Sequence, residues 1–173
     1  IAGAGLTANG EIQLIGHNST VVANEYSDIF HFLKVNSDGD TVWTIAKNPT
    51  PSVLTEAILT QDGGMLLSGK IQSPTNNRVF TMKLDSLANE EWSIDWAAKG
   101  SSPIAACESS NREYYVANPE SYLIGDTAFV DSKITKLDED GNVLFSKTYL
   151  GVEGPTGLSF GPQKAIATSD GGV

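Results

Sequence analysis

The feature that most constrains the fold of this chain is an internal repeat, in which a polar turn separates two short apolar segments. The stretch LTQDGGMLLSG (59–69) is one copy, and related copies lie at 6–16, 108–118 and 167–173. The aligned turn residues are 53, 49 and 59 positions apart along the chain: Asn9, Asp62, Asn111 and Asp170. Repeats with a period of about 50 residues are typical of architectures built from one supersecondary unit used several times.

A second landmark supports the same register. The segments FLKVNSDGDTVW (32–43), TMKLDSLANEEW (81–92) and ITKLDEDGNVLF (134–145) align without a gap. Their lysines are 49 and 53 residues apart, and an aromatic residue follows each lysine nine positions later. These pairs are Lys34 with Trp43, Lys83 with Trp92, and Lys136 with Phe145. Two landmarks that agree in order and spacing make a chance match a poor explanation.

Each period contains four short segments with strand-like composition. In the second period these are TEAILT (55–60), GMLLSGK (64–70), RVFTMKLD (78–85) and EEWSIDW (90–96). They are rich in β-branched, aromatic and aliphatic residues and are bounded by turn formers. QDGG, NSDGD and DEDGN are then hairpin turns, in which glycine adopts backbone angles that other residues resist.

Four antiparallel strands that recur about every 50 residues predict an all-β fold, the β-propeller. We expect blades at 1–50, 51–101 and 102–162, with the first strand of a fourth at 163–173. Propellers have at least about four blades, because a single blade cannot bury both of its faces. The chain is therefore expected to belong to a larger ring, completed by further sequence or by another chain.

The combination of SDGG, an aliphatic strand and KLDxxGxxxW resembles a family of bacterial β-propeller repeats, near the PQQ-like and WD40-like propellers. The resemblance covers nearly the whole chain, although the third period has SNRE in place of DGG and the second has SLAN where glycine is usual. Members of this family occur in secreted and outer-membrane-anchored proteins. The resemblance implies an extracytoplasmic, bacterial scaffold or interaction module.

Composition excludes several classes of function. The net charge of −10 and the pI near 4.5 argue against binding to a nucleic-acid backbone, which requires clustered lysine and arginine. No apolar run is long enough to span a membrane as a helix. Cys107 is the single cysteine, and the two histidines form no zinc-ligand pattern with it. We assign no catalytic, metal-binding or cofactor-binding residue, and no cofactor.

Two recurrent features have both a structural and a functional interpretation. NSDGD and DEDGN resemble part of a calcium loop, but glycine is missing from the sixth position that such a loop requires, so a hairpin turn explains them better. The repeated lysines could line a channel and bind an anion, or pair with Asp85, Asp138 or other acids of the same blade. Because these lysines and aromatics recur in every period, we favour structural roles for both.

The non-repeating segments are the better candidates for binding, because binding residues concentrate on loops held by a rigid scaffold. The longest are 17–28, 118–131 and 149–163, and the first two lie between the second and third strands of their blades. The candidate rim-loop contact residues are Tyr26, Tyr122, Leu123 and Phe129. The alternative is that these apolar side chains fold back over their own blades.

The leading functional hypothesis is a non-enzymatic extracytoplasmic module that binds or scaffolds proteins in a cell-surface or secreted assembly. One alternative is part of a propeller enzyme acting on a glycan or small alcohol, which should place two carboxylates across a solvent-filled pocket. Another is a structural spacer in an adhesin-like protein.

Overall fold

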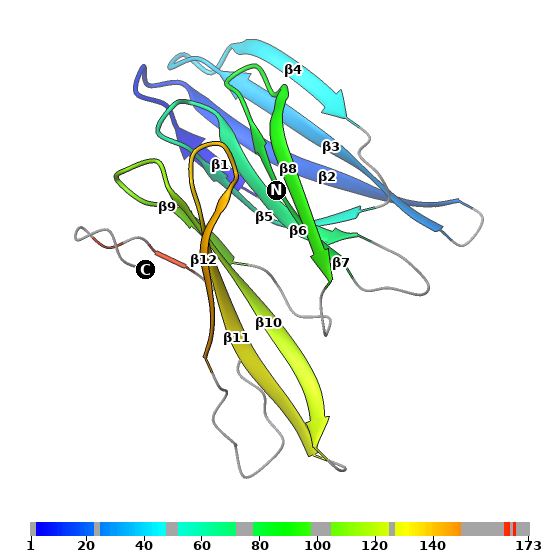
Figure 1. Cartoon of the computed structure of the whole chain (residues 1–173). Coiled ribbons are helices and arrows are strands. Elements are labelled where there is room, and N and C mark those ends of the chain that lie inside the picture. Colours follow the sequence, from blue (N-terminus) through cyan, green and yellow to red (C-terminus); the bar gives the residue numbers. More distant parts are fainter. Residues whose placement is uncertain are drawn as a thin grey trace. The chain divides into compact units, whose positions relative to one another are not determined.

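A computed structural model describes residues 3–22, 25–47, 52–71, 78–97, 105–124 and 127–149, together with 165, 166 and 168. The described residues form twelve β-strands and no helix (Figure 1). The all-β class predicted from the repeat is therefore confirmed. In the described part of the chain there is accordingly no helix with the length and apolar character needed to cross a membrane.

The strands form three four-stranded antiparallel sheets, and in each sheet the strand order follows the chain. The first sheet contains β1 (Gly3–Leu6), β2 (Ile12–Val22), β3 (Glu25–Val35) and β4 (Thr41–Lys47). The second contains β5 (Ser52–Leu59), β6 (Met65–Ile71), β7 (Arg78–Leu84) and β8 (Glu90–Ala97). The third contains β9 (Ala105–Glu108), β10 (Tyr114–Ile124), β11 (Thr127–Leu137) and β12 (Val143–Tyr149).

One turn geometry connects the first two strands and the last two strands of every sheet. In the turn after β1, the Thr7 N–H donates to the Glu11 carbonyl at 2.8 Å, and the Gly10 N–H donates to the Thr7 carbonyl at 3.0 Å. The same pair of bonds recurs in the turns that begin at Asn36, Thr60, Asp85, Ser109 and Asp138. This pattern is a three-residue hairpin loop whose last residue adopts positive φ.

Glycine is not required at that last loop position. Gly10, Gly39, Gly63 and Gly141 occupy it in four turns, but Ala88 (φ 61°) and Arg112 (φ 58°) occupy it in the other two. In the turn that contains Ala88, Asp85 Oδ1 accepts the N–H groups of Leu87 and Asn89 at 2.9 and 2.7 Å. These side-chain bonds hold the loop closed, so the turn persists where the sequence has lost glycine.

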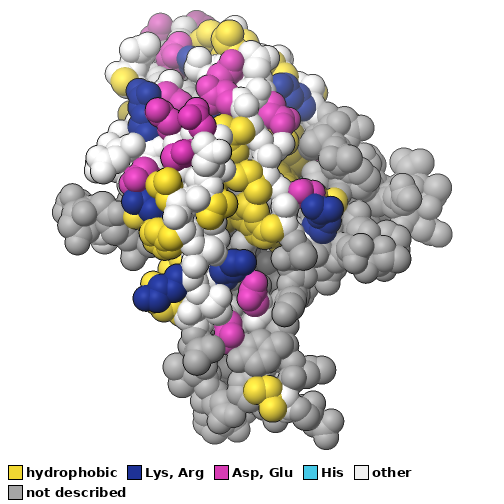
Figure 2. Space-filling view, in the orientation of Figure 1, with side chains coloured by type: hydrophobic (Ala, Val, Ile, Leu, Met, Phe, Trp, Pro, Cys, Tyr) yellow, Lys and Arg dark blue, Asp and Glu magenta, His cyan; other side chains and the backbone are white. Residues whose placement is uncertain are grey.

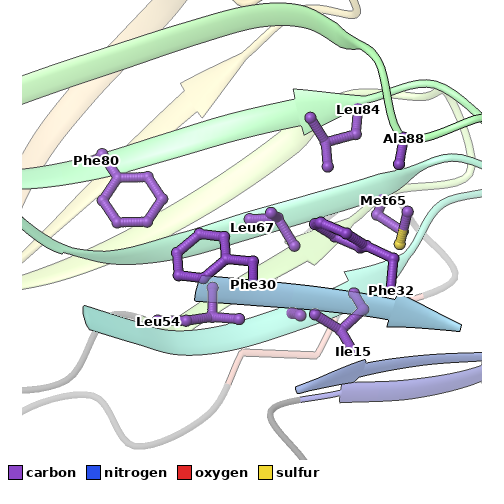
Figure 3. Close-up of a cluster of buried hydrophobic side chains, with 10 residues drawn as sticks. Ile15, Phe30, Phe32, Leu54, Met65, Leu67, Phe80, Leu84 and Ala88 are labelled. Atoms are coloured by element: carbon purple, nitrogen blue, oxygen red, sulfur yellow. The ribbon is translucent and has the colours of Figure 1, made fainter. Parts of the chain in front are cut away.

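The chain divides into two compact units, residues 1–95 and 96–173. In the first unit, the first and second sheets face each other across an apolar core (Figure 3). Its buried members are Ile15, Phe30, Phe32, Leu54, Ala57, Met65, Leu67, Phe80, Leu84 and Ala88. The rings of Phe30 and Phe80, one from each sheet, stack with their centroids 6.4 Å apart. Truncating such a buried aromatic side chain to alanine costs about 3–5 kcal/mol.

The two sheets of the first unit approach most closely at β1 and β5. A methyl group added to Gly3 would lie 2.4 Å from the Ala57 carbonyl oxygen, and one added to Gly5 would lie 2.5 Å from the Leu59 Cβ. Only glycine leaves enough room for this contact. Farther out, between β3–β4 and β6–β8, the same two sheets enclose an open cavity. The space between them therefore widens from the first strands toward the last.

The third sheet, in the second unit, buries small and aromatic side chains. Ala105 and Ala106 on β9 are buried, as are Tyr114 and Val116 on β10. Cys107 is buried on β9 as well, as expected for a cysteine that packs as a small apolar side chain.

The structure corrects the prediction that 17–28 and 118–131 are loops. Their described residues, 17–22 and 25–28 in the first and 118–124 and 127–131 in the second, are paired backbone of β2 with β3 and of β10 with β11. Of the third predicted loop, 149–163, only Tyr149 is described, and it ends β12. Most of 163–173, where a further strand was expected, also lies outside the described residues.

Candidate functional site

Two hairpins extend beyond the common length of their sheets, and we call them the first and second arms. Among the described residues of the first sheet, the pairing of β4 with β3 reaches Phe30, and the pairing of β2 with β3 reaches Val22 and Glu25. In the described part of the third sheet, the pairing of β12 with β11 reaches Ser132, and the pairing of β10 with β11 reaches Ile124 and Thr127 (Figure 1). The first arm comprises residues 18–29 and the second comprises 120–131, of which 23–24 and 125–126 lie outside the described residues.

The predicted contact residues all lie on these two arms. Tyr26 is paired opposite Val21 in the first arm, and Tyr122 is paired opposite Phe129 in the second, with Leu123 next to Tyr122. Residues paired directly opposite one another share a face of a hairpin, so Tyr122 and Phe129 share one. Only the backbone of these four residues is described, and their side chains lie outside the described part of the chain.

A histidine–carboxylate contact lies at the base of the first arm. His17 Nδ1 is 3.2 Å from Asp28 Oδ2, and the Asp28 side chain is fully buried. Sequence reasoning missed this contact, because only the pairing of His17 with Phe30 places Asp28 diagonally across from the histidine. A buried carboxylate beside an imidazole fixes the orientation of the ring.

The repeated lysines pair with acids next to the turn between the first two strands of their own sheets. Lys34 contacts Glu11 at 2.6 Å and Lys136 contacts Glu113 at 2.7 Å. Of the alternatives considered for these lysines, the structure shows pairing with acids of the same sheet, and the acids are not Asp85 or Asp138, the two named from the sequence.

Lys83 is the buried member of the lysine series. Its side chain is 1% exposed, and its ammonium group donates to Asp62 at 2.7 Å, to Glu91 at 2.9 Å and to the Leu84 carbonyl at 3.0 Å. In this sheet Gly64 occupies the position of the acid found in the other two, and a methyl group there would lie 2.6 Å from Lys83 Nζ. All three donors of the buried ammonium are thus satisfied.

Three aspartates have lowered pKa values, and all three lie in hairpin turns. Burial would raise the pKa of Asp62, but hydrogen bonds from Lys83, Thr60 and the Gly64 N–H outweigh it and hold the pKa below 3.8. Burial would also raise the pKa of Asp85, but hydrogen bonds from Asn89 and Leu87 bring this pKa below 3.8. The Asn142 side chain and backbone lower the pKa of Asp138.

These hydrogen bonds support the hairpin interpretation of the calcium-like segments. Asp138 Oδ1 accepts the N–H groups of Asp140 and Asn142 at 3.0 and 2.7 Å, and its Oδ2 accepts the Asn142 side-chain amide at 3.0 Å. Asn36 Oδ1 likewise accepts the N–H groups of Asp38 and Asp40. Among the described residues no group of three or more histidine, cysteine or acidic side chains is arranged to hold a metal ion.

The first unit contains a cavity of about 330 Å³ between its two sheets. Its apolar walls are Phe30, Phe32, Leu67, Met82 and Leu84, and its charged residues are Lys47 and Glu90. Lys47 Nζ donates to the Ala88 carbonyl, and Glu90 Oε1 accepts the Ser93 hydroxyl at 2.5 Å. In Figure 3, Phe30 and Phe32 of β3 are directed toward Leu67 and Leu84 of the second sheet.

A second cavity of about 260 Å³ lies beside β7 and β8 and is lined by Phe80, Ile94 and Asp95 among others. Each of the two cavities is lined by one carboxylate, Glu90 in the first and Asp95 in the second. The three carboxylates with shifted pKa values lie elsewhere, in the turns.

Comparison with known proteins gives no assignment, since no protein-family model matches the chain and no curated protein matches it either.

Proposed function

We propose that the chain is part of a β-propeller that acts as a non-enzymatic scaffold or protein-binding module outside the cytoplasm of a bacterium. Three successive four-stranded sheets, each built from consecutive antiparallel strands with the same turns, are the units such a ring requires. The glycine-rich β1 that lies against β5, and the widening toward the outer strands, fit sheets arranged around an axis.

The pattern of burial supports a ring that continues beyond these three sheets. The second sheet buries side chains on both faces, including Leu66 and Thr81 as well as Met65 and Leu67. The strands of the first and third sheets leave large apolar side chains exposed, namely Leu6, Ile12 and Val42 in the first, and Ile124, Val143, Leu144, Phe145 and Tyr149 in the third. The exposed Leu87 of the second sheet lies in the turn between β7 and β8. Figure 2 shows exposed apolar side chains among acidic ones. Further blades on both sides would bury these faces.

The observation that carries the binding role is the pair of arms. They occupy equivalent positions in the first and third sheets. Within the described part of the chain, no pairing of β3 with β4 is found beyond Phe30, and none of β11 with β12 beyond Ser132. Such an edge can accept a strand from a partner, and alternate side chains such as Tyr122 would then select it.

Site-specific photo-crosslinking in the source cells tests this proposal. A photoreactive phenylalanine analogue placed at Tyr26 or Tyr122 should give one discrete crosslinked partner, while the same group at the exposed turn residue Asp38 should not. Replacing 120–131 with Asn-Gly joins the paired residues Pro119 and Ser132 in a two-residue hairpin and should abolish the Tyr26 product if both arms bind one partner. Equal labelling from Asp38, or no product from either arm, would contradict the binding role.

A further inference from the structure

The 330 Å³ cavity is lined by Lys47, which stands at a position where the repeat is broken. Lys47 lies 13 residues after Lys34, and the residues 13 positions after Lys83 and Lys136 are Trp96 and Tyr149. The strand register agrees, since Lys47 is paired opposite Phe30 and Tyr149 is paired opposite the equivalent residue Ser132. Where the other two sheets carry a large aromatic side chain, the first sheet carries a lysine.

The walls of the cavity are suited to a flat or branched apolar group. Phe30, Phe32, Leu67 and Leu84 are at most 1% exposed, so the inner surface of the cavity is formed by buried apolar side chains. Apolar cavities of about 150 Å³ already bind benzene-sized molecules, and typical ligand pockets begin at about 300 Å³. The cavity can therefore take an aromatic or large aliphatic side chain.

The charged residues of the cavity have opposite signs and unused bonding capacity. The Lys47 ammonium has three donors, of which the Ala88 carbonyl takes one. The Glu90 carboxylate can accept several hydrogen bonds in addition to the one from Ser93. Together they complement a carboxylate and an ammonium on the same small molecule.

We propose that this cavity is a binding site for a free amino acid with an aromatic or large aliphatic side chain. The side chain fills the space between the two sheets, the α-carboxylate pairs with Lys47 and the α-ammonium pairs with Glu90. The site is independent of the ring and of the arms, because both sheets belong to one compact unit.

Isothermal titration of the 173-residue chain with L-phenylalanine tests the proposal. L-phenylalanine should bind, L-serine should not, and toluene and phenethylamine should bind at least about tenfold more weakly, because each lacks one or both charged groups. Lys47→Gln and Glu90→Gln should each weaken binding by about tenfold or more. Lys47→Trp, which restores the aromatic residue of the other sheets, should abolish binding and raise the melting temperature by filling the cavity.

Met82→Trp fills the cavity from the opposite sheet while it leaves Lys47 and Glu90 in place, and it too should abolish binding. No heat with L-phenylalanine at about 10 mM would overturn the proposal, since even a weak specific site would be detected there. Binding that survives both tryptophan variants would place the ligand elsewhere. Toluene binding as tight as that of L-phenylalanine would refute the role of the two charges. None of these variants alters the arms, so crosslinking at Tyr122 should persist in all of them.

Discussion

Replacing Lys83 with methionine tests how the buried ammonium contributes to stability. Methionine keeps most of the apolar volume but removes two ion pairs, to Asp62 and Glu91, and one bond to a backbone carbonyl. Removing one partner of a buried ion pair costs about 3–5 kcal/mol. Asp62 and Glu91 remain 29% and 45% exposed, so water partly replaces the lysine. We therefore expect a loss of about 2–3 kcal/mol.

Lys34 provides a matched control at the equivalent repeat position of the same compact unit. Its side chain is 16% exposed and makes one ion pair, to Glu11. Lys34→Met should cost no more than about 1 kcal/mol. Urea unfolding followed by the fluorescence of the three tryptophans measures both free energies of unfolding.

The pH dependence of the Lys83→Met effect has a definite sign. Hydrogen bonding to Lys83 helps to hold the folded-state pKa of Asp62 below 3.8. Asp62 therefore contributes stability that is present above pH 3.8 and is lost as the pH falls through its lower folded-state value. The difference in the free energy of unfolding between wild type and Lys83→Met should be largest at neutral pH and should become smaller below about pH 4. Equal losses in the two lysine variants, or a difference that persists at about pH 2, would refute the reasoning.

Three further predictions concern the turns and the close contact of the sheets. Arg112→Gly should stabilise the chain by about 0.5–1 kcal/mol because it removes the cost of positive φ, whereas Gly39→Ala, at φ 88°, should destabilise it by about 1 kcal/mol. The midpoints of urea unfolding measure both effects, and a lower stability of Arg112→Gly would contradict the prediction. Gly5→Ala should lower the thermal stability by about 1–3 kcal/mol because its methyl group meets Leu59. Gly16→Ala, whose methyl group meets nothing within 4 Å, should change the thermal stability by no more than about 0.5 kcal/mol. Equal effects of the two substitutions would argue against the close approach of β1 to β5. Asp85→Asn keeps an Oδ1 acceptor, as Asn36 does in its own turn, so its free energy of unfolding in urea should stay within about 0.5 kcal/mol of wild type. Asp85→Ala removes that acceptor and should lower the free energy of unfolding by about 1 kcal/mol. The opposite order would mean that the charge of Asp85, and not its hydrogen bonds in the turn, stabilises this hairpin.

The sequence predicted the strands and turns of the second sheet closely, because both depend on local chemistry. The predicted segments 55–60, 64–70, 78–85 and 90–96 correspond to β5, β6, β7 and β8 within a few residues at each end. The turns could be predicted even without glycine, because the residue that begins each loop is always Thr, Ser, Asn or Asp.

The arms and the cavity could not be predicted, because neither has a local signal. HNSTVVANEYSD (17–28) lacks the alternation of apolar and polar residues that marks a strand. Its backbone is extended because it continues the register already set between Ile12 and Val35. The cavity depends on the distance between two sheets and on the size of the side chain at position 47, and a single sequence encodes only the second of these.

The order of strands in each sheet has a consequence for how the chain acquires its structure. Every sheet consists of consecutive strands, so the first can form completely from residues 3–47 before the rest of the chain has left the ribosome. Local pairing of this kind lowers contact order and favours rapid folding of each sheet. Docking of one sheet on the next is then the slow step, and until it occurs a newly made sheet exposes the apolar face that carries Phe30 and Phe32. Folding of the first unit should therefore proceed in chain order, with the first sheet serving as the template on which the second docks.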